Sequence, residues 1–311
     1  MSDPFVTVVV PAYNAELYIT EALDSVVAQT FSDYEVVIVD DGSTDATARL
    51  VEPYLADPRF SLIGQNNAGL AGARNTGVSA SKGTWIALLD ADDAWMPQKL
   101  ERQVELAKCD TPPALIFSNG IEFDEIGDLC PFYRDPDKFP EGEIIRRLMR
   151  GNCLWAPSVM IRRQDVIDVG MFRKGVAEDF DLWLRILERG GEVRGVWEPL
   201  TRYRKRSDSL SANKRVMYER LMQIYSDAIS RTTRRDHRAI LSESLQRTKS
   251  DLQFVRAREL LATDTATAWQ IRRQILAGWW AFPRRVKVMR LLAYSLMGQD
   301  AKLTKALARK W

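Results

Sequence analysis

The hydrophobic residues in the first 120 positions come in short continuous runs separated by amphipathic stretches. Residues 5–10 read FVTVVV and residues 35–39 read EVVIV, as is typical of strands buried on both faces of a sheet. Similar runs predict strands at 60–64, 84–89 and 114–118. Because these runs alternate with helical patterns, the sequence predicts an α/β fold with a doubly wound, mostly parallel sheet.

The stretches between the strands carry apolar residues at helical spacing. They predict helices at 15–30, with Asn14 as N-cap, at 43–55, with Ser43 or Thr44 as cap, and at 69–81 and 97–107. Glycines in the third of these helices would let it approach the sheet closely. A layered sheet covered by helices on both faces follows from this alternation.

The pattern changes after residue 120. A loop-like stretch at 121–150 precedes a strand that reads SVMIRR and a helix at 178–190. From about residue 214 the chain reads as consecutive helices rich in arginine. We therefore predict one domain at 1–212, built from parts at 1–120 and 121–212, and a basic helical extension at 213–311.

Composition adds an asymmetry of charge. The net charge is +2, but residues 201–311 hold 25 Lys and Arg against 9 Asp and Glu. The three cysteines have no CxxC spacing and indicate ordinary thiols in a reducing compartment. With no basic and apolar leader and no apolar run of membrane-spanning length, we expect a cytoplasmic protein.

Polar clusters follow three of the predicted strands. PAYN comes after the first, DDGSTD after the second and DADD after the fourth. In open α/β sheets the carboxyl ends of the strands form the ligand-binding edge. The sequence therefore predicts a polar site at that edge.

Three carboxylates within DADD, at 90–93, repel one another and need compensation. A hard divalent cation such as Mg²⁺ or Mn²⁺ supplies it, and Mg²⁺ commonly takes one or two carboxylates plus substrate phosphates. The alternative is an acidic turn that caps the following helix.

Two other polar groups leave alternatives open. Asp40 and Asp41 could accept hydrogen bonds from a base or a ribose, or could belong to a strand-to-helix turn. Arg74 could pair with acidic side chains or face a diphosphate bidentately.

Taken in order, PAYN, VDDGSTD, NAGLAGARNTG, LLDADD and EDFDLWLR resemble the motif series of the family 2 glycosyltransferases, which adopt the GT-A fold. The resemblance covers roughly residues 5 to 211. It implies a nucleotide-sugar half at 1–120, an acceptor half at 121–212, and transfer of a sugar with inversion at the anomeric carbon. UDP is the expected nucleotide of the donor, with GDP and dTDP as alternatives, and a saccharide or a lipid-linked molecule is the expected acceptor.

The resemblance also assigns roles to residues. Asp179 is the expected general base, with Asp181 as the alternative base. The expected donor-binding residues are Pro11, Ala12, Tyr13, Asp40, Asp41, Arg74 and Asp90, and the expected metal ligands are Asp92 and Asp93. Glu178 is an expected contact of the diphosphate or the acceptor, although acids also favour a helix N-terminus on their own account.

One segment departs from the family pattern. It reads YRKRSDSLS at 203–211, with Arg206 where the family often has a histidine. Arg206 or Lys205 could then bind the diphosphate directly, or the affinity for the metal could be lower.

The basic extension has three candidate partners. Aromatic and basic residues at 269–297 suit an anionic membrane surface, and the alternatives are the catalytic domain itself or a second copy in a homodimer. Nucleic acid is not expected, since no recognition motif accompanies the charge. Rival functions are a nucleotidyltransferase and a non-catalytic sugar-nucleotide-binding scaffold, but PAYNAELY lacks the Gly and Lys of a phosphate loop.

Overall fold

The computed structural model describes residues 3–206, 213–262, 270, 273–274 and 276–277. They belong to two compact units, the first formed by Met1–Leu148 and Asn152–Ser207 and the second by Met149–Gly151 and Asp208–Trp311.

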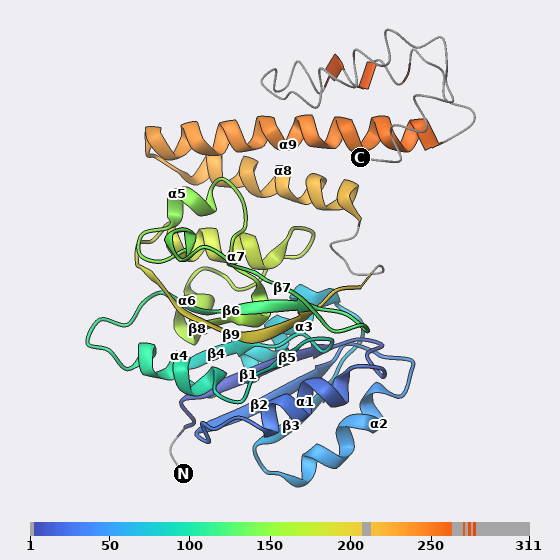
Figure 1. Ribbon diagram of the computed structural model, residues 1–311, viewed down its shortest axis with the longest axis vertical. Helices are drawn as coiled ribbons and strands as arrows, with labels where there is room; N and C mark the ends of the chain where they lie inside the picture. Colours follow the sequence, from blue (N-terminus) through green and yellow to red (C-terminus); the bar gives the residue numbers. More distant parts are fainter. Residues whose placement is uncertain (1–2, 207–212, 263–269, 271–272, 275, 278–311) are drawn as a thin grey trace. The chain divides into compact units, whose positions relative to one another are not determined.

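The first unit is built on a nine-stranded mixed sheet in the order β3-β2-β1-β4-β8-β6-β9-β5, with β7 paired to β6 (Figure 1). Its strands are β1 (Val6–Ala12), β2 (Tyr34–Asp40), β3 (Phe60–Gly64), β4 (Trp85–Leu88), β5 (Ala94–Trp95), β6 (Leu115–Phe123), β7 (Asp128–Pro131), β8 (Val159–Arg162) and β9 (Val193–Arg204). Strands β1 to β4 pair in parallel, as do β6 and β9. The remaining pairs are antiparallel. The predicted α/β fold with a mostly parallel sheet is confirmed.

Helices cover both faces of this sheet. They are α1 (Ile19–Val27), α2 (Thr47–Val51), α3 (Gly69–Ala80), α4 (Lys99–Ala107), α5 (Ile145–Leu148), α6 (Arg163–Asp168) and α7 (Glu178–Leu187), with 3-10 turns η1 (Glu52–Ala56), η2 (Pro136–Lys138) and η3 (Ala156–Ser158). Leu23 of α1 and Leu100 of α4 share one apolar cluster with Val8 of β1. Figure 1 shows α1 and α2 on one side of the sheet and α6 and α7 on the other.

Helix α3 lies unusually close to the strands, as its small residues predict. A Cβ added at Gly77 would lie 2.4 Å from Cγ1 of Val9, so no larger residue fits there without movement. Ala73 of the same helix packs with Val37 and Val39 on the face opposite α1. This close approach brings Arg74, the next residue along α3, to the sheet.

The prediction for the start of the first helix is wrong. Asn14 has φ 48° and does not cap a helix, and α1 begins only at Ile19. Instead, Asn14 Oδ1 accepts a hydrogen bond from Thr44 N at 2.8 Å, and Ser43 Oγ accepts one from Asn14 N at 3.0 Å. The expected cap residues therefore link the loop after β1 to the loop after β2. The polar groups of these two loops, which lie at the same sheet edge, form hydrogen bonds with one another.

Strand β9 was not anticipated from the sequence. Its sequence, VRGVWEPLTRYR, contains Gly195 and Pro199 and has no regular apolar alternation. It forms nonetheless because it pairs with β6 along its length, with register shifts near Asn119. This strand delivers Arg204 and the residues after it to the carboxyl edge of the sheet.

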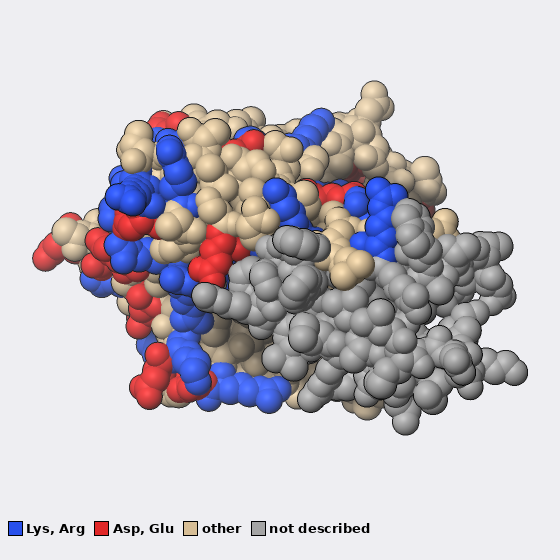
Figure 2. Space-filling view, turned by 90° about the horizontal axis from the view of Figure 1, so that it is seen from above, with Lys and Arg blue, Asp and Glu red and all other residues tan. Residues whose placement is uncertain are grey.

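The second unit contains two packed helices, α8 (Lys214–Arg231) and α9 (Arg235–Ala262), as the arginine-rich pattern predicts. Part of its positive charge is compensated internally, because Arg215 and Arg256 both pair with Glu219 at 3.4 and 3.2 Å. On the face drawn in Figure 2, basic and acidic side chains are interspersed. In the described part of the chain, no helix is long and apolar enough to cross a membrane. The aromatic residues from Trp269 onward, on which the membrane prediction depends, lie outside the described residues.

Candidate functional site

The loops after β1 and β2 meet at the carboxyl edge of the sheet. Pro11 and Ala12 end β1 and are buried, whereas Tyr13 comes next and is 52% exposed. Ala12 is in register with Asp40, and the N–H of Asp41 donates to the Ala12 carbonyl at 2.8 Å. Two of the predicted donor-binding motifs therefore adjoin.

Asp41 is buried and has a structural task of its own. Its carboxylate accepts hydrogen bonds from Gln65 Nε2 at 2.6 Å, Ala68 N at 2.8 Å and Gly69 N at 2.9 Å. These bonds fix the start of α3, where unsatisfied N–H groups and the helix dipole favour a negative charge. A carboxylate offers about four acceptor sites, so contact with a base would use the remaining one. Asp40 is less buried, and its Oδ1 accepts from Ser43 N at 3.0 Å.

Arg74 joins two motifs that are far apart in the sequence. Its Nη2 donates to Asp90 Oδ1 at 2.6 Å, after β4, and its Nη1 donates to Glu178 Oε1 at 2.7 Å, at the start of α7. The side chain is only 1% exposed. Burial alone would lower the pKa of Arg74, but Asp90 and Glu178 raise it above its ordinary value. Of the two roles left open for Arg74, the structure shows pairing with acids.

The three carboxylates of the DADD turn are compensated in different ways. Asp90 is paired with Arg74, and Asp92 Oδ2 accepts from Arg206 Nη1 at 3.2 Å. Asp93 is buried, and its Oδ1 accepts from Arg204 N at 2.7 Å. Burial raises the pKa of Asp93 well above its ordinary range, and the neighbouring Asp92 raises it further.

The oxygens of this turn suit a hard divalent cation. Asp92 is 32% exposed and can be reached from solvent, while Asp93 Oδ2 is buried and has no hydrogen-bond partner among the described residues. Within the described residues no three acidic, cysteine or histidine side chains gather into a complete metal cage. Such a turn can therefore hold Mg²⁺ or Mn²⁺ when phosphate oxygens complete the coordination.

Asp179 lies in the first turn of α7, and hydrogen bonds reach both of its carboxylate oxygens. Its Oδ1 accepts from Phe180 N at 2.6 Å, and its Oδ2 accepts from Asn152 Nδ2 at 3.0 Å. Burial and the adjacent charge of Glu178 raise the pKa of Asp179 to about 7, although Arg74 and these two N–H donors oppose the rise.

Asp181 does not share this environment. It is fully buried, and its Oδ2 accepts from Arg173 Nε and Arg185 Nε, each at 2.8 Å. Arg185 in turn donates to the backbone carbonyl of Val169. A carboxylate held by two guanidinium groups is not available as a base, so Asp181 is a structural anchor of α7.

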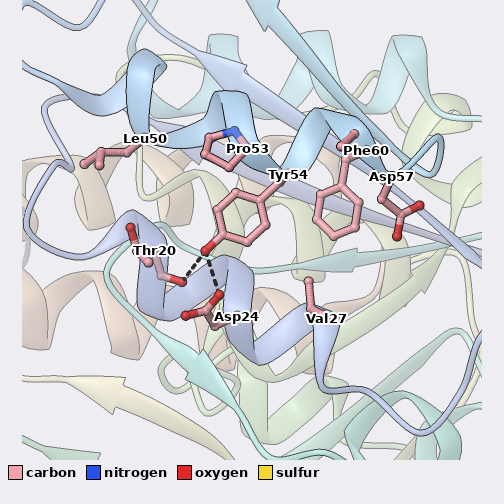
Figure 3. Close-up of a pocket in the computed structure, with 9 residues that line it drawn as sticks. Thr20, Asp24, Val27, Leu50, Pro53, Tyr54, Asp57 and Phe60 are labelled. Atoms are coloured by element: carbon pink, nitrogen blue, oxygen red, sulfur yellow. Dashed lines mark hydrogen bonds between the residues drawn. The ribbon is translucent and has the colours of Figure 1, made fainter.

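Two further features lie apart from this cluster. Lys205, which we expected as a diphosphate contact, pairs with Glu122 at 2.8 Å. An open groove of about 650 Å³ lies between α1 and η1, where Tyr54 donates to Asp24 Oδ1 at 2.6 Å (Figure 3). None of the predicted site residues lines that groove, which therefore has no part in the arrangement described above.

Sequence reasoning missed two residues of the cluster: Arg204, whose N–H binds Asp93, and Asn152. Asn152 follows the loop-like stretch at 121–150, and a single asparagine after Gly151 carries no chemical signal by itself. Only the folded chain brings Asn152 to Asp179.

Comparison with known proteins places the chain in a family of enzymes. Residues 7–166 match the family model described as Glycosyl transferase family 2. The chain is 32% identical over 219 residues to the "Putative teichuronic acid biosynthesis glycosyltransferase TuaG" of Bacillus subtilis, an alignment that covers 68% of this chain and 83% of that protein. It is 29% identical over 233 residues to the uncharacterized glycosyltransferase MJ1057 of Methanocaldococcus jannaschii, covering 73% and 79%.

Solved structures with the same fold include two with donors bound. S. aureus TarS 1–349 in complex with UDP-GlcNAc superposes with a TM-score of 0.67 at 20% identity, covering 100% of this chain and 91% of that one. The mannosyltransferase PcManGT of Pyrobaculum calidifontis, in complex with GDP-Man and Mn²⁺, superposes with a TM-score of 0.60 at 21% identity, covering 100% and 88%.

Proposed function

Because the chain belongs to glycosyltransferase family 2 and has the GT-A fold, we propose that it transfers a sugar from a nucleoside diphosphate, by preference UDP, with inversion at the anomeric carbon. The acceptor is a hydroxyl of a saccharide or of a lipid-linked molecule in the synthesis of a cell-surface polysaccharide. TuaG is named for teichuronic acid biosynthesis, which supports this acceptor class.

The observation that carries the proposal is the bridge made by Arg74. It links Asp90, on the donor side of the site, to Glu178, beside the candidate base Asp179. Donor and acceptor chemistry need groups from distant parts of the chain at one place, and this buried ion-paired bridge provides that proximity.

On the donor side, the nucleotide would lie along the loops after β1 and β2. Pro11, Ala12 and the exposed Tyr13 line the base pocket in this proposal, with Asp40 and Asp41 next to them. Asp90 would contact the ribose or the sugar. Arg74 has a positioning role toward Asp90 and Glu178, because its guanidinium is buried between them.

On the acceptor side, Asp179 would take the proton from the acceptor hydroxyl. The hydroxyl oxygen then forms a bond to the anomeric carbon as the bond from that carbon to the diphosphate oxygen breaks. A base positioned opposite the leaving group makes this a single displacement, which inverts the configuration. A base with a pKa near 7 is well matched to this task at neutral pH.

The leaving diphosphate carries charge that has to be compensated. Asp92, with Asp93 as the less exposed neighbour, would hold a divalent cation that acts as a Lewis acid toward the diphosphate. The complex of PcManGT with GDP-Man and Mn²⁺ supports this choice of cofactor. Arg206 forms an ion pair with Asp92, so the protein itself also supplies a positive charge at this position.

A screen of nucleotide sugars tests the proposal directly. Thermal unfolding is measured with UDP-, GDP- and dTDP-sugars, with and without Mn²⁺, and the stabilising donor is then offered to saccharide acceptors while free nucleoside diphosphate is assayed. Asp179→Asn should still be stabilised by the donor but should lose transfer by at least about 10²-fold, given typical general-base contributions. Asp168→Asn, a change in a surface pair with Arg189, is the control. Full transfer by Asp179→Asn would rule out this base.

A further inference from the structure

Among the described residues, Asn152 is the one amide side chain that is hydrogen-bonded to Asp179, the candidate base. It lies in the segment between α5 and η3, 27 positions before Asp179 in the sequence. Its Nδ2 donates to Asp179 Oδ2 at 3.0 Å. The contact is therefore a tertiary one, made between a loop and the first turn of α7.

The orientation of the Asn152 amide is fixed by a second contact. Its Oδ1 accepts a hydrogen bond from Leu154 N at 3.1 Å. Because a backbone N–H can only donate, the atom facing it must be the amide oxygen, and the amide nitrogen must face Asp179. Asn152 thus presents a donor to the carboxylate.

Asp179 is held at both oxygens as a result. Phe180 N binds Oδ1 and Asn152 Nδ2 binds Oδ2, which selects one rotamer of the carboxylate. Donors to the ionised form favour that form over the protonated one. The charged groups that act on Asp179 are Glu178 on its own helix, which opposes ionisation, and Arg74 on α3, which favours it.

The side chain of Asn152 has little to do in holding the fold together. It is exposed, and a solvent-exposed amide contributes little to stability by burial. Its two hydrogen bonds serve a local turn and Asp179. The main effect of the Asn152 side chain is therefore on the carboxylate of Asp179.

We propose that Asn152 is a positioning residue for the reaction: it orients the Asp179 carboxylate toward the acceptor hydroxyl and keeps it ionised. This rests on the proposed function, in which Asp179 is the general base. The role differs from catalysis in the strict sense, since Asn152 acts through Asp179.

The test is the dependence of kcat/KM on pH in two variants. The activity of the unaltered enzyme should rise with pH through the pKa of Asp179. Asn152→Ala removes the hydrogen-bond donor. The rise of kcat/KM on the acid side of the pH profile, called the acid limb below, should then move to higher pH by about one pH unit. Asn152→Asp keeps the shape but places a second carboxylate at Oδ2, so it should move the limb further. The KM for the donor should stay within about twofold in both.

Two references make the result decisive. In the Asp179→Asn background, Asn152→Ala should leave the residual rate and its pH dependence unchanged, because the group it acts on is gone. The carboxyl ¹³C shift of Asp179, assigned by its loss in Asp179→Asn, gives the same pKa without turnover. Unchanged limbs and an unchanged ¹³C titration in both Asn152 variants would overturn the inference. If instead Asp179→Asn itself retains full transfer, the proposed function fails first.

Discussion

Arg206 forms an ion pair with Asp92, the carboxylate that we propose as the metal ligand. Its Nη1 lies 3.2 Å from Asp92 Oδ2, and its guanidinium carbon lies 4.6 Å from the centre of the Tyr18 ring. Burial and the charge of Asp90 raise the pKa of Asp92, while Arg206 opposes them. A side chain of the protein and a divalent cation therefore compete for one oxygen.

This competition predicts a donor-independent effect on metal affinity. Arg206→Ala should bind Mn²⁺ more tightly than the unaltered protein in the absence of nucleotide, by about threefold to tenfold, since a partly exposed pair of this kind contributes about 1 kcal/mol. Titration of free Mn²⁺ by electron paramagnetic resonance measures it. Lys205→Ala is the matched control, because that neighbouring cation pairs with Glu122. An unchanged or weaker affinity in Arg206→Ala would show that the arginine does not compete.

Asp181 and Asp179 lie two positions apart on α7, and the structure predicts opposite consequences for their neutralisation. Asp181→Asn leaves Arg173 and Arg185 facing an amide and should lower the free energy of unfolding by about 3 kcal/mol. Urea denaturation measures this loss, with Asp168→Asn as the surface control. The acid limb of kcat/KM should not move in the folded Asp181→Asn enzyme. A stable variant with a shifted limb would instead assign Asp181 to the chemistry.

Lys99 is buried and has no carboxylate partner among the described residues. Its side chain is fully buried, with Nζ 2.7 Å from Gln103 Oε1 and 3.9 Å from the centre of the Trp95 ring. The ring face attracts a cation, but burial outweighs it and lowers the pKa of Lys99 well below its ordinary value. Burial of Lys99 therefore lowers the free energy of unfolding of the native state.

Replacing Lys99 should stabilise the protein, and more so at lower pH. The unfolded chain binds more protons than the native state between the lowered native pKa and about 10.5, so the destabilisation by Lys99 grows as pH falls through this window. Lys99→Met should raise the free energy of unfolding at pH 7 by about 1–2 kcal/mol, and the gain should shrink toward pH 10. Lys82→Met, at an exposed position, is the control in urea denaturation. A gain that does not depend on pH would mean that Lys99 is charged in the native state.

Several local features could be predicted from the sequence because they depend on neighbours along the chain. The apolar runs at 35–39 and 60–64 predict β2 and β3 almost to the residue, and small residues predict the close packing of α3. The helix boundaries were less accurate. Asn14, expected as a cap, bonds to the Thr44 loop instead, because its partner lies 30 positions away.

What the sequence determined by itself was the alternation of buried strands and amphipathic helices, and with it the placing of the polar motifs at one sheet edge. Only the tertiary structure decided how those carboxylates are used. In the folded chain Asp41 accepts hydrogen bonds from the start of α3, Asp181 pairs with two arginines and Asp90 pairs with Arg74. Folding also brings Asn152 within hydrogen-bond distance of Asp179. Hydrophobic periodicity is local and can be read along one chain, whereas the partner of a buried charge is set by contacts between distant segments.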